Sequence, residues 1–157
     1  MAYIPLTGGK FALVDDEDFQ RLSVHRWLTD KTGYAFRFDR SGASARKIFM
    51  HRDVLGLTDP AVLTDHANGN KADNRKANLR ECTKGQNNVN KGRQRNNTMG
   101  FKGVCWSPRL RKWYSYIRVP GARRFLGTYA TPHEAHEVYC LAADLIHGEF
   151  ANHGGSR

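Results

Sequence analysis

The chain has 157 residues, of which 39% are hydrophobic, and a formal net charge of +10. This length suits one ordinary domain or two small ones, and no apolar run approaches the roughly 18 residues that a membrane span needs, which argues against a membrane protein. The chain opens without a basic stretch leading into an apolar one, and its three cysteines form no CxxC pair. We therefore expect an intracellular, unsecreted protein with reduced thiols, without a disulfide framework or a zinc ribbon.

The positive charge is distributed unevenly. Residues 1–60 include nine basic and eight acidic side chains, whereas residues 61–157 include sixteen basic and seven acidic ones. Between His66 and Arg124 the counts are fifteen basic and two acidic. These cations alternate with aromatic and amide side chains instead of forming a plain lysine tract. The pattern favours a nucleic-acid partner over a merely solvated surface.

Residues 1–60 are predicted to be rich in β-structure. Strands are expected at 10–14, 33–38 and 47–50, because aromatic residues in the middle run alternate with smaller or charged ones, which is the period of a half-buried strand. Short helices are expected within 15–27 and 51–57.

Residues 61–90 predict the order strand, loop, strand, helix. The run 61–64 reads as a strand that leads into Asp65 and His66, and 78–82 reads as a second strand. A helix should begin at Thr83, which starts a Thr-x-x-Gln capping-box pattern. Residues 91–98 are polar and basic without periodicity, so we interpret them as a linker.

Residues 99–157 predict three antiparallel strands packed on one helix. The strands are expected at 101–107, 112–119 and 123–130. The helix should begin after Thr131, which is followed by a proline and a capping-box glutamate. Its core-facing side is predicted from helical spacing to include Ala135, Val138, Tyr139, Ala142, Leu145 and Ile146. The overall prediction is an α+β protein with a first domain at 1–90, a linker at 91–98 and a second domain at 99–157.

The strand at 112–119 has two distinct faces. Trp113, Ser115, Ile117 and Val119 suit burial against the helix, whereas Lys112, Tyr114, Tyr116 and Arg118 point the other way. Arg123 and Phe125 extend this second face on the next strand, with Leu126 turned inward. A sheet face that combines arginine, lysine and aromatic side chains can lie in a major groove. Trp106 and Tyr139 are expected to belong to the core.

The motif region predicts phosphodiester hydrolysis. Such a reaction needs a base to deprotonate water and a cation to neutralise charge on the phosphate and the leaving oxygen. His66 titrates near neutral pH and suits the first task. Asp65 and Asn87 offer hard oxygen donors that suit Mg²⁺ or Mn²⁺, and they would make a poor zinc site. Asn78 can hold the 67–77 loop and thereby His66. Adjacent side chains on a regular strand point to opposite sides, so we expect Asp65 and His66 at a strand end, or one of them outside the strand.

The stretch DHANGNKADNRKANLRECTKGQN, from Asp65 to Asn87, resembles the phage-type HNH (His-Asn-His, ββα-metal) homing endonucleases. The resemblance covers about residues 47–90. It implies a metal site at Asp65 and Asn87, His66 as general base and Asn78 as loop anchor. Asn87 stands where the plain pattern has a final histidine, a replacement that the homing-type branch tolerates. A phage-encoded protein of this kind would act in the cytoplasm of a bacterial host.

Residues 99–154 resemble the AP-two/ethylene-response-factor DNA-binding domain. The matching pieces are Lys102-Gly103-Val104, Lys112 to Arg118, Leu126 to Tyr129 and the alanine-rich helix. The resemblance implies that DNA faces Lys102, Arg109, Tyr116, Arg118, Arg123 and Phe125. Cys105 and Ser107 replace arginines that are usual in plant members, so no base preference is carried over. Outside this domain we expect DNA contacts from Arg52, Arg75, Arg93 and Arg95, although residues 91–98 could equally be a plain tether.

Three functions are compatible with the sequence. The first is a Mg²⁺-dependent endonuclease that acts as a monomer on double-stranded DNA, nicks one strand per site and needs no obligatory protein partner. The second is a DNA-binding regulator in which the nuclease motif is vestigial. The third is a protein that binds or cuts RNA, because aromatic residues on a sheet also stack on single-stranded bases.

Overall fold

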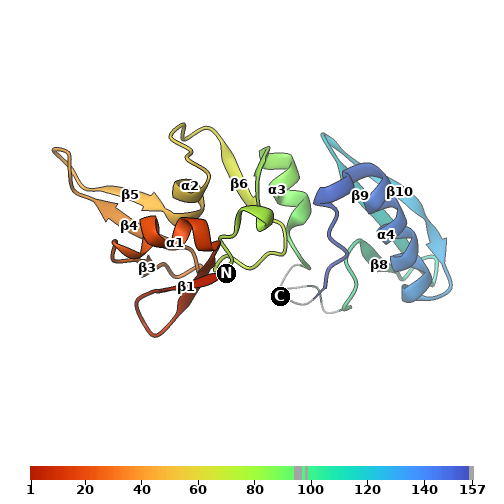
Figure 1. The fold of residues 1–157 in the computed structure, drawn as a ribbon. Helices are drawn as coiled ribbons and strands as arrows, with labels where there is room; N and C mark the ends of the chain where they lie inside the picture. Colours follow the sequence, from red (N-terminus) through yellow and green to blue (C-terminus); the bar gives the residue numbers. More distant parts are fainter. Residues whose placement is uncertain (94–96, 98, 156–157) are drawn as a thin grey trace. The chain divides into compact units, whose positions relative to one another are not determined.

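The computed structural model describes residues 1–93, 97 and 99–155 (Figure 1). The chain forms two compact units, Met1–Thr83 and Lys84–Arg157. Both units combine small antiparallel sheets with α-helices, so the predicted α+β class is confirmed. No helix in the described part of the chain is long and apolar enough to cross a membrane.

The first unit contains three small sheets, with β1 paired to β2, the order β3-β4-β5, and β6 paired to β7. Its elements are β1 (Ala2–Pro5), β2 (Phe11–Val14), α1 (Asp16–Ser23), β3 (Leu28–Thr29), β4 (Ala35–Asp39), β5 (Arg46–Phe49), α2 (Met50–Val54), β6 (Leu63–His66), the 3₁₀ helix η1 (Lys76–Asn78) and β7 (Leu79–Cys82). The predicted β-rich character is confirmed. Strands β1 and β3 were not predicted, and β6 extends through both residues of the Asp65-His66 pair.

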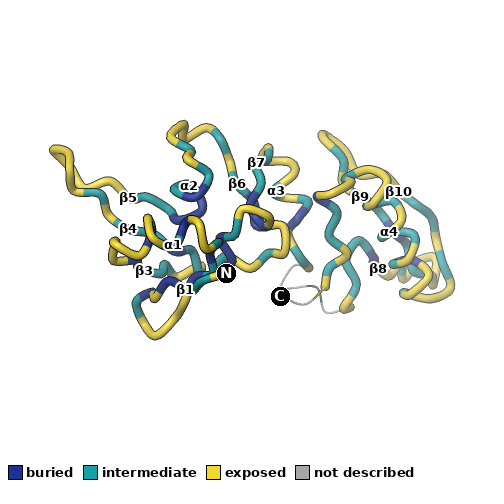
Figure 2. Tube along the Cα trace, in the orientation of Figure 1, coloured by how far each residue is buried: buried dark blue, intermediate teal, exposed yellow. Residues whose placement is uncertain are grey.

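One hydrophobic core holds the first unit together (Figure 2). Its buried members are Ile4, Leu6, Ala12, Val14, Leu22, Trp27, Ala35, Met50, Val54 and Leu79. The indole Nε1 of Trp27 donates to the carbonyl oxygen of Leu22 at 2.8 Å, so this large ring is buried without an unpaired donor. The motif loop is tied to the same core through β2, because the backbone N–H of Leu13 donates to Ala72 and that of Asn74 donates to Leu13.

The second unit begins with α3 (Lys84–Asn90) and contains a three-stranded sheet in the order β10-β9-β8. Its other elements are β8 (Val104–Ser107), β9 (Lys112–Val119), β10 (Ala122–Tyr129), α4 (Pro132–His147) and the 3₁₀ helix η2 (Gly148–Phe150). Helix α4 covers one face of the sheet (Figure 1). The predicted start of α4 is confirmed, because Thr131 and Glu134 form a reciprocal capping box.

The helix and the sheet bury small side chains where they meet. Ser115 and Ile117 of β9 are fully buried, as predicted, and so are Ala135 and Ala143 of α4. Tyr139 is also buried, which confirms its predicted place in the core.

Three residues predicted to be core are exposed instead. Leu145 is 87% and Ile146 is 42% exposed, so the buried stripe of α4 is narrower than the apolar pattern indicated. Trp106 is 40% exposed. It shares a face with Val104 and contacts Trp113, with 5.1 Å between ring centroids, but it lies on edge strand β8, where that face is incompletely covered.

The C-terminal end of α3 is bonded within the second unit. The Lys102 ammonium donates to the carbonyl oxygens of Val89, Lys91 and Asn152 at 2.7 to 2.9 Å. The side-chain amide of Asn152 donates to the carbonyl oxygen of Asn90 at 2.9 Å. These bonds satisfy carbonyl groups that the end of a helix leaves unpaired.

Candidate functional site

Asp65 and His66 occupy the last two positions of β6, in agreement with their expected place at a strand end. The antiparallel register pairs Asp65 with Arg80 and His66 with Leu79 on β7. Both side chains are nearly fully buried, with 6% of Asp65 and 4% of His66 exposed. A carboxylate and an imidazole that are both buried at the end of a two-stranded ribbon are more suited to chemistry than to a solvated turn.

The imidazole of His66 is oriented by Asn74, a residue that was not predicted as part of the site. The amide nitrogen of Asn74 donates to the carbonyl oxygen of Ala72 at 3.2 Å, so its oxygen is available to His66. The Nε2 atom of His66 lies 3.4 Å from that oxygen. Because an amide oxygen can only accept, this contact favours the tautomer with the hydrogen on Nε2, in which the lone pair of the neutral ring is on Nδ1.

Aromatic rings surround His66. The ring of Tyr34 lies 5.7 Å from it between centroids, and that of His51 lies 5.4 Å from it in an edge-on arrangement. Burial lowers the pKa of His66 below its usual value, although Asn74 and Asp65 favour the protonated form. His66 is therefore neutral at neutral pH and able to accept a proton.

Asn78 is hydrogen-bonded to the loop between His66 and β7. Its side-chain oxygen accepts from the backbone N–H of Asn68 at 2.9 Å, and its amide donates to the carbonyl oxygen of Asp73 at 2.8 Å. Its own carbonyl oxygen accepts from the N–H of Ala67. The side chain thus spans the loop that separates His66 from β7, and it lies in η1 at the start of that strand.

Asp65 forms an ion pair with Arg80 across the β6–β7 ribbon. The Nε and Nη2 atoms of Arg80 donate to Oδ2 of Asp65 at 3.0 and 2.8 Å. Only 15% of the Arg80 side chain and 7% of the Asp65 side chain are exposed. This guanidinium was not predicted as part of the site. It compensates the buried carboxylate and reduces the net negative charge available to a cation there.

Asn87 lies in the first turn of α3 and is partly exposed. The chain order strand, loop, strand, helix is therefore as predicted. Asp65 belongs to the first unit and Asn87 to the second. Among the described residues, no group of three or more histidine, cysteine, aspartate or glutamate side chains could hold a metal ion. A site made of one carboxylate and one amide oxygen would not form such a group.

The basic residues predicted to contact DNA in the motif region have partners within the fold. Arg52 donates to the carbonyl oxygens of Val62 and Asp59 and so holds the segment between α2 and β6. Arg75 forms a two-bond ion pair with Asp73, at 2.8 and 2.7 Å, with 34% of its side chain exposed.

The two linker arginines differ in what the structure describes. Arg93 donates to the carbonyl oxygen of Gly100 at 2.8 Å. Arg95 lies outside the described residues. The predictions for both as DNA contacts stay predictions.

The face of the C-terminal sheet opposite α4 displays the predicted aromatic and basic residues. Phe125 is 67% exposed and pairs with Tyr116, and Arg123 pairs with Arg118. The Arg123 guanidinium lies over the Tyr116 ring, 4.7 Å from its centroid. We call Tyr114, Tyr116, Arg118, Arg123 and Phe125 the outer sheet face.

The two remaining predicted contacts of this unit lie apart from that group. Arg109 is exposed in the turn between β8 and β9. Lys102 donates to three carbonyl oxygens, and burial lowers its pKa to about 8. An ammonium has three hydrogens, so these bonds use its whole donor capacity within the fold.

His51, packed against His66, is expected to make the protein sensitive to acid. Burial, with a contribution from the nearby His66 and Arg52, lowers the pKa of His51 to about 3, and its buried Nδ1 has no hydrogen-bond partner among the described residues. An unfolded histidine binds a proton near pH 6.5, so the unfolded state binds more protons between these values. The contribution of His51 to stability is therefore fully present above pH 6.5 and is lost as the pH decreases from 6.5 towards 3.

The variant His51→Phe tests this expectation. Phenylalanine can stack on Phe49 as His51 does, with 5.4 Å between centroids, but takes up no proton. Urea unfolding at pH 7 and at about pH 4.5 should show a smaller loss of stability in the variant than in the wild type. The same loss in both proteins would contradict the assignment.

Comparison with known proteins relates the chain to a class of nucleases. No family model matches the sequence, and no solved structure matches it. The chain is 27% identical over 154 residues to a protein of Acanthamoeba polyphaga mimivirus named as an uncharacterized HNH endonuclease. The alignment covers 96% of this chain and 80% of that protein. This similarity supports a relationship between the chain and the HNH endonucleases.

Proposed function

We propose that the protein is a Mg²⁺-dependent DNA endonuclease of the HNH homing type that nicks one strand of duplex DNA per active site. The observation that carries the proposal is the buried, neutral His66 at the end of β6, oriented by Asn74 and adjacent in sequence to the Asp65 carboxylate. The similarity to a protein named as an HNH endonuclease supports it.

His66 acts as the general base in this proposal. Its ring accepts a proton from the attacking water through Nδ1, while the Nε2–H stays bonded to the amide oxygen of Asn74. Asn74 thereby stabilises the imidazolium that forms. Asn78 fixes the intervening loop and so limits the movement of the base.

In this proposal Asp65 offers a carboxylate oxygen to the divalent cation, and Asn87 stays a predicted ligand. One carboxylate and one amide oxygen are hard donors that fit Mg²⁺ or Mn²⁺ with retained water ligands, and they lack the nitrogen and sulfur atoms that zinc prefers. When bound, the cation supplies neutralisation of charge on the scissile phosphate and the leaving 3′ oxygen. Two hydrogen bonds from Arg80 hold the Asp65 carboxylate in place within the ribbon.

The outer sheet face is proposed to bind the DNA duplex. Arg118 and Arg123 lie directly opposite each other on neighbouring strands, and like charges in this position repel. A phosphate between them would remove that repulsion. The exposed Phe125 and the half-buried Tyr116 add apolar area beside these cations, suited to sugars or thymine methyl groups.

Incubation with supercoiled plasmid tests the proposed activity. Nicked circles should accumulate with Mg²⁺ or Mn²⁺ and should not form when a chelator is present from the start. Binding to a DNA duplex should persist in the chelator, because the outer sheet face needs no metal. Binding without any cation-dependent cleavage would favour the regulator with a vestigial motif, and preference for RNA in competition would contradict the DNA assignment.

Arg123 and its neighbour Arg124 provide a matched pair for testing the outer sheet face. Their side chains alternate across β10, so Arg123 shares the outer face with Tyr116 and Arg124 points away from it. Arg123→Ala should reduce the slope of log affinity against log salt by about 0.9, the value for one phosphate contact. Arg124→Ala should leave that slope nearer to the wild-type value. Equal effects of the two variants, measured by fluorescence anisotropy, would argue against a directed face.

A further inference from the structure

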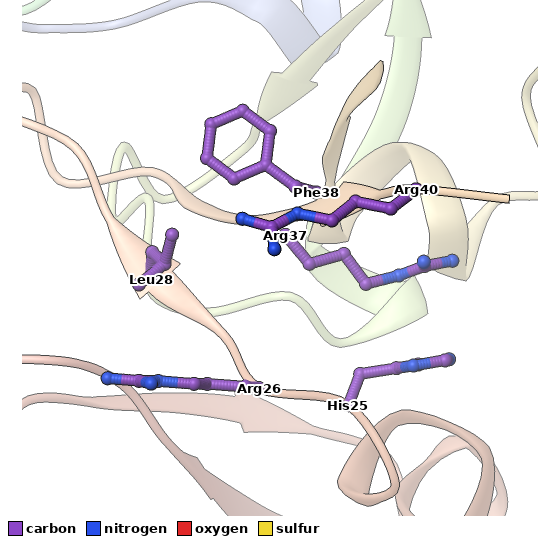
Figure 3. Close-up of a pocket in the computed structure, with 6 residues that line it drawn as sticks. All are labelled: His25, Arg26, Leu28, Arg37, Phe38 and Arg40. Atoms are coloured by element: carbon purple, nitrogen blue, oxygen red, sulfur yellow. The ribbon is translucent and has the colours of Figure 1, made fainter. Parts of the chain in front are cut away.

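A basic hollow lies on the first unit, apart from the candidate active site. It has a volume of about 530 Å³. It is lined by His25, Arg26, Leu28, Arg37, Phe38 and Arg40 (Figure 3). Three arginines, one histidine and two apolar side chains form this lining, and no carboxylate is among them. Such a composition is unexpected in residues 1–60, where nine basic side chains are almost balanced by eight acidic ones.

The hollow is built on two segments that the fold holds firmly. His25 and Arg26 precede β3 and are followed by Trp27, whose ring is buried in the core and bonded to Leu22. The other wall is β4 and the residue after it, which carry Arg37, Phe38 and Arg40 (Figure 3). Pairing of β3 with β4 fixes the two segments relative to each other.

The arginines of the hollow have different roles. Arg37 is committed to the fold, because it donates to Asp53 at 3.0 and 3.2 Å and lies 5.7 Å from the centroid of the Trp27 ring. Arg26 and Arg40 are exposed and have no ion-pair partner among the described residues. The lining of the hollow thus includes two exposed cations that have no ion-pair partner in the described part of the chain, which favours binding of an external anion.

The apolar part of the lining indicates what kind of anion fits. Phe38 is 46% exposed and packs edge-on against Phe36, with 5.6 Å between ring centroids. Leu28 is half-buried beside it. A small inorganic anion would gain nothing from this surface, whereas a nucleotide backbone offers sugar carbons between its phosphates. Arginines next to an exposed aromatic ring are suited to such a ligand.

We propose that this hollow binds the phosphodiester backbone of duplex DNA, with Arg26 and Arg40 each contacting a phosphate and Phe38 contacting the sugars between them. The inference rests on the proposed function, because it supplies a DNA contact on the unit that carries His66. It makes the N-terminal segment part of the substrate-binding surface as well as a brace for the motif.

The test compares two double variants of the full chain that remove the same charge. Arg26→Ala with Arg40→Ala removes the two cations of the hollow, and Lys10→Ala with Lys31→Ala removes two exposed cations of the same unit outside it. Binding to a DNA duplex of mixed sequence is measured by anisotropy in chelator at several salt concentrations. Loss of two phosphate contacts should reduce the slope of log affinity against log salt by about 1.8. Between 50 and 200 mM salt, the fold-loss of affinity should therefore be about ten times smaller in this variant than in the wild type. Arg26→Lys with Arg40→Lys should retain most of the slope.

The outcomes separate this inference from the proposed function. The role of the hollow would be overturned if the Arg26/Arg40 alanine variant bound DNA with the wild-type salt slope. It would also be overturned if the Lys10/Lys31 variant lost as much of the slope as the Arg26/Arg40 variant. Either result would leave the nuclease proposal intact. Reduced binding to an RNA duplex alone would overturn the choice of DNA. Inorganic phosphate at constant ionic strength should not displace the duplex. If it displaced the duplex from the wild type but not from the Arg26/Arg40 alanine variant, the hollow would be a site for small anions and the proposal would be overturned. Failure of the wild-type chain to bind any DNA duplex would overturn both proposals.

Discussion

His66→Ala is expected to reduce the rate of plasmid nicking by about 10²–10⁴-fold, the usual contribution of a general base. The affinity for duplex DNA should stay near that of the wild type, because the ring is nearly fully buried at the end of β6 and lies outside the outer sheet face. Single-turnover cleavage with Mg²⁺ and binding in chelator give the two measurements.

His153→Ala is a suitable control for that experiment. His153 is an exposed histidine that pairs with Asp144 in the second unit, so its loss should leave cleavage unchanged. A His66 variant that cuts at the wild-type rate would exclude this residue as the base. A variant that loses affinity as much as rate would show that His66 binds the substrate and does not act in the chemical step.

Separate replacement of Asp65 or Arg80 by alanine should lower the free energy of unfolding by about 3–5 kcal/mol, which is typical for breaking a buried ion pair. Each single change leaves a mostly buried charge without this partner, since 7% and 15% of the two side chains are exposed. The loss is large compared with the total stability of an ordinary domain, about 5–15 kcal/mol. Urea unfolding of both variants measures it.

The double variant separates pairing from chemistry. Asp65→Ala together with Arg80→Ala removes both charges and should cost less than the sum of the single changes. The near-isosteric Asp65→Asn should abolish Mg²⁺-dependent cleavage even at temperatures where the variant stays folded, because it removes the carboxylate proposed to hold the cation. Additive stability losses would show that the ion pair contributes little, and full cleavage by Asp65→Asn would contradict the ligand role.

Features with short-range causes were predictable from the sequence. The start of α4 follows from Thr131 and Glu134, which need only each other to cap a helix. The alternation that separates Ser115 and Ile117 from Tyr116 and Arg118 follows from strand geometry alone.

Features that depend on partners distant in the sequence were not predictable. Leu145 and Ile146 have the right spacing for a core stripe, but the sheet contacts the alanine side of α4 and leaves them exposed. Strand β3 has only two residues and exists because β4 pairs with it, so its sequence carries too little periodicity to indicate it.

In the candidate site, too, local features were predictable from the sequence and contacts between distant residues were not. The identities of Asp65, His66 and Asn78 could be proposed from the motif, since their spacing carries the pattern. The partners that tune them could not, because the Asp65–Arg80 contact depends on the β6–β7 register and the His66–Asn74 contact on the path of the loop. The number of basic residues also overstates how many cations can contact DNA. The ammonium of Lys102, for example, donates all of its hydrogens to backbone carbonyl oxygens.

The bonds at the end of α3 have a consequence for dividing the gene into fragments. A fragment ending at residue 90 would keep α3 but remove Lys102 and Asn152, whose side chains bond to the carbonyl oxygens of Val89 and Asn90. The helix that carries Asn87 would then end in unpaired carbonyl groups and fray. A C-terminal fragment beginning at Lys84 keeps these bonds, so recombinant expression of the second half is better started there than at the polar stretch beyond the helix.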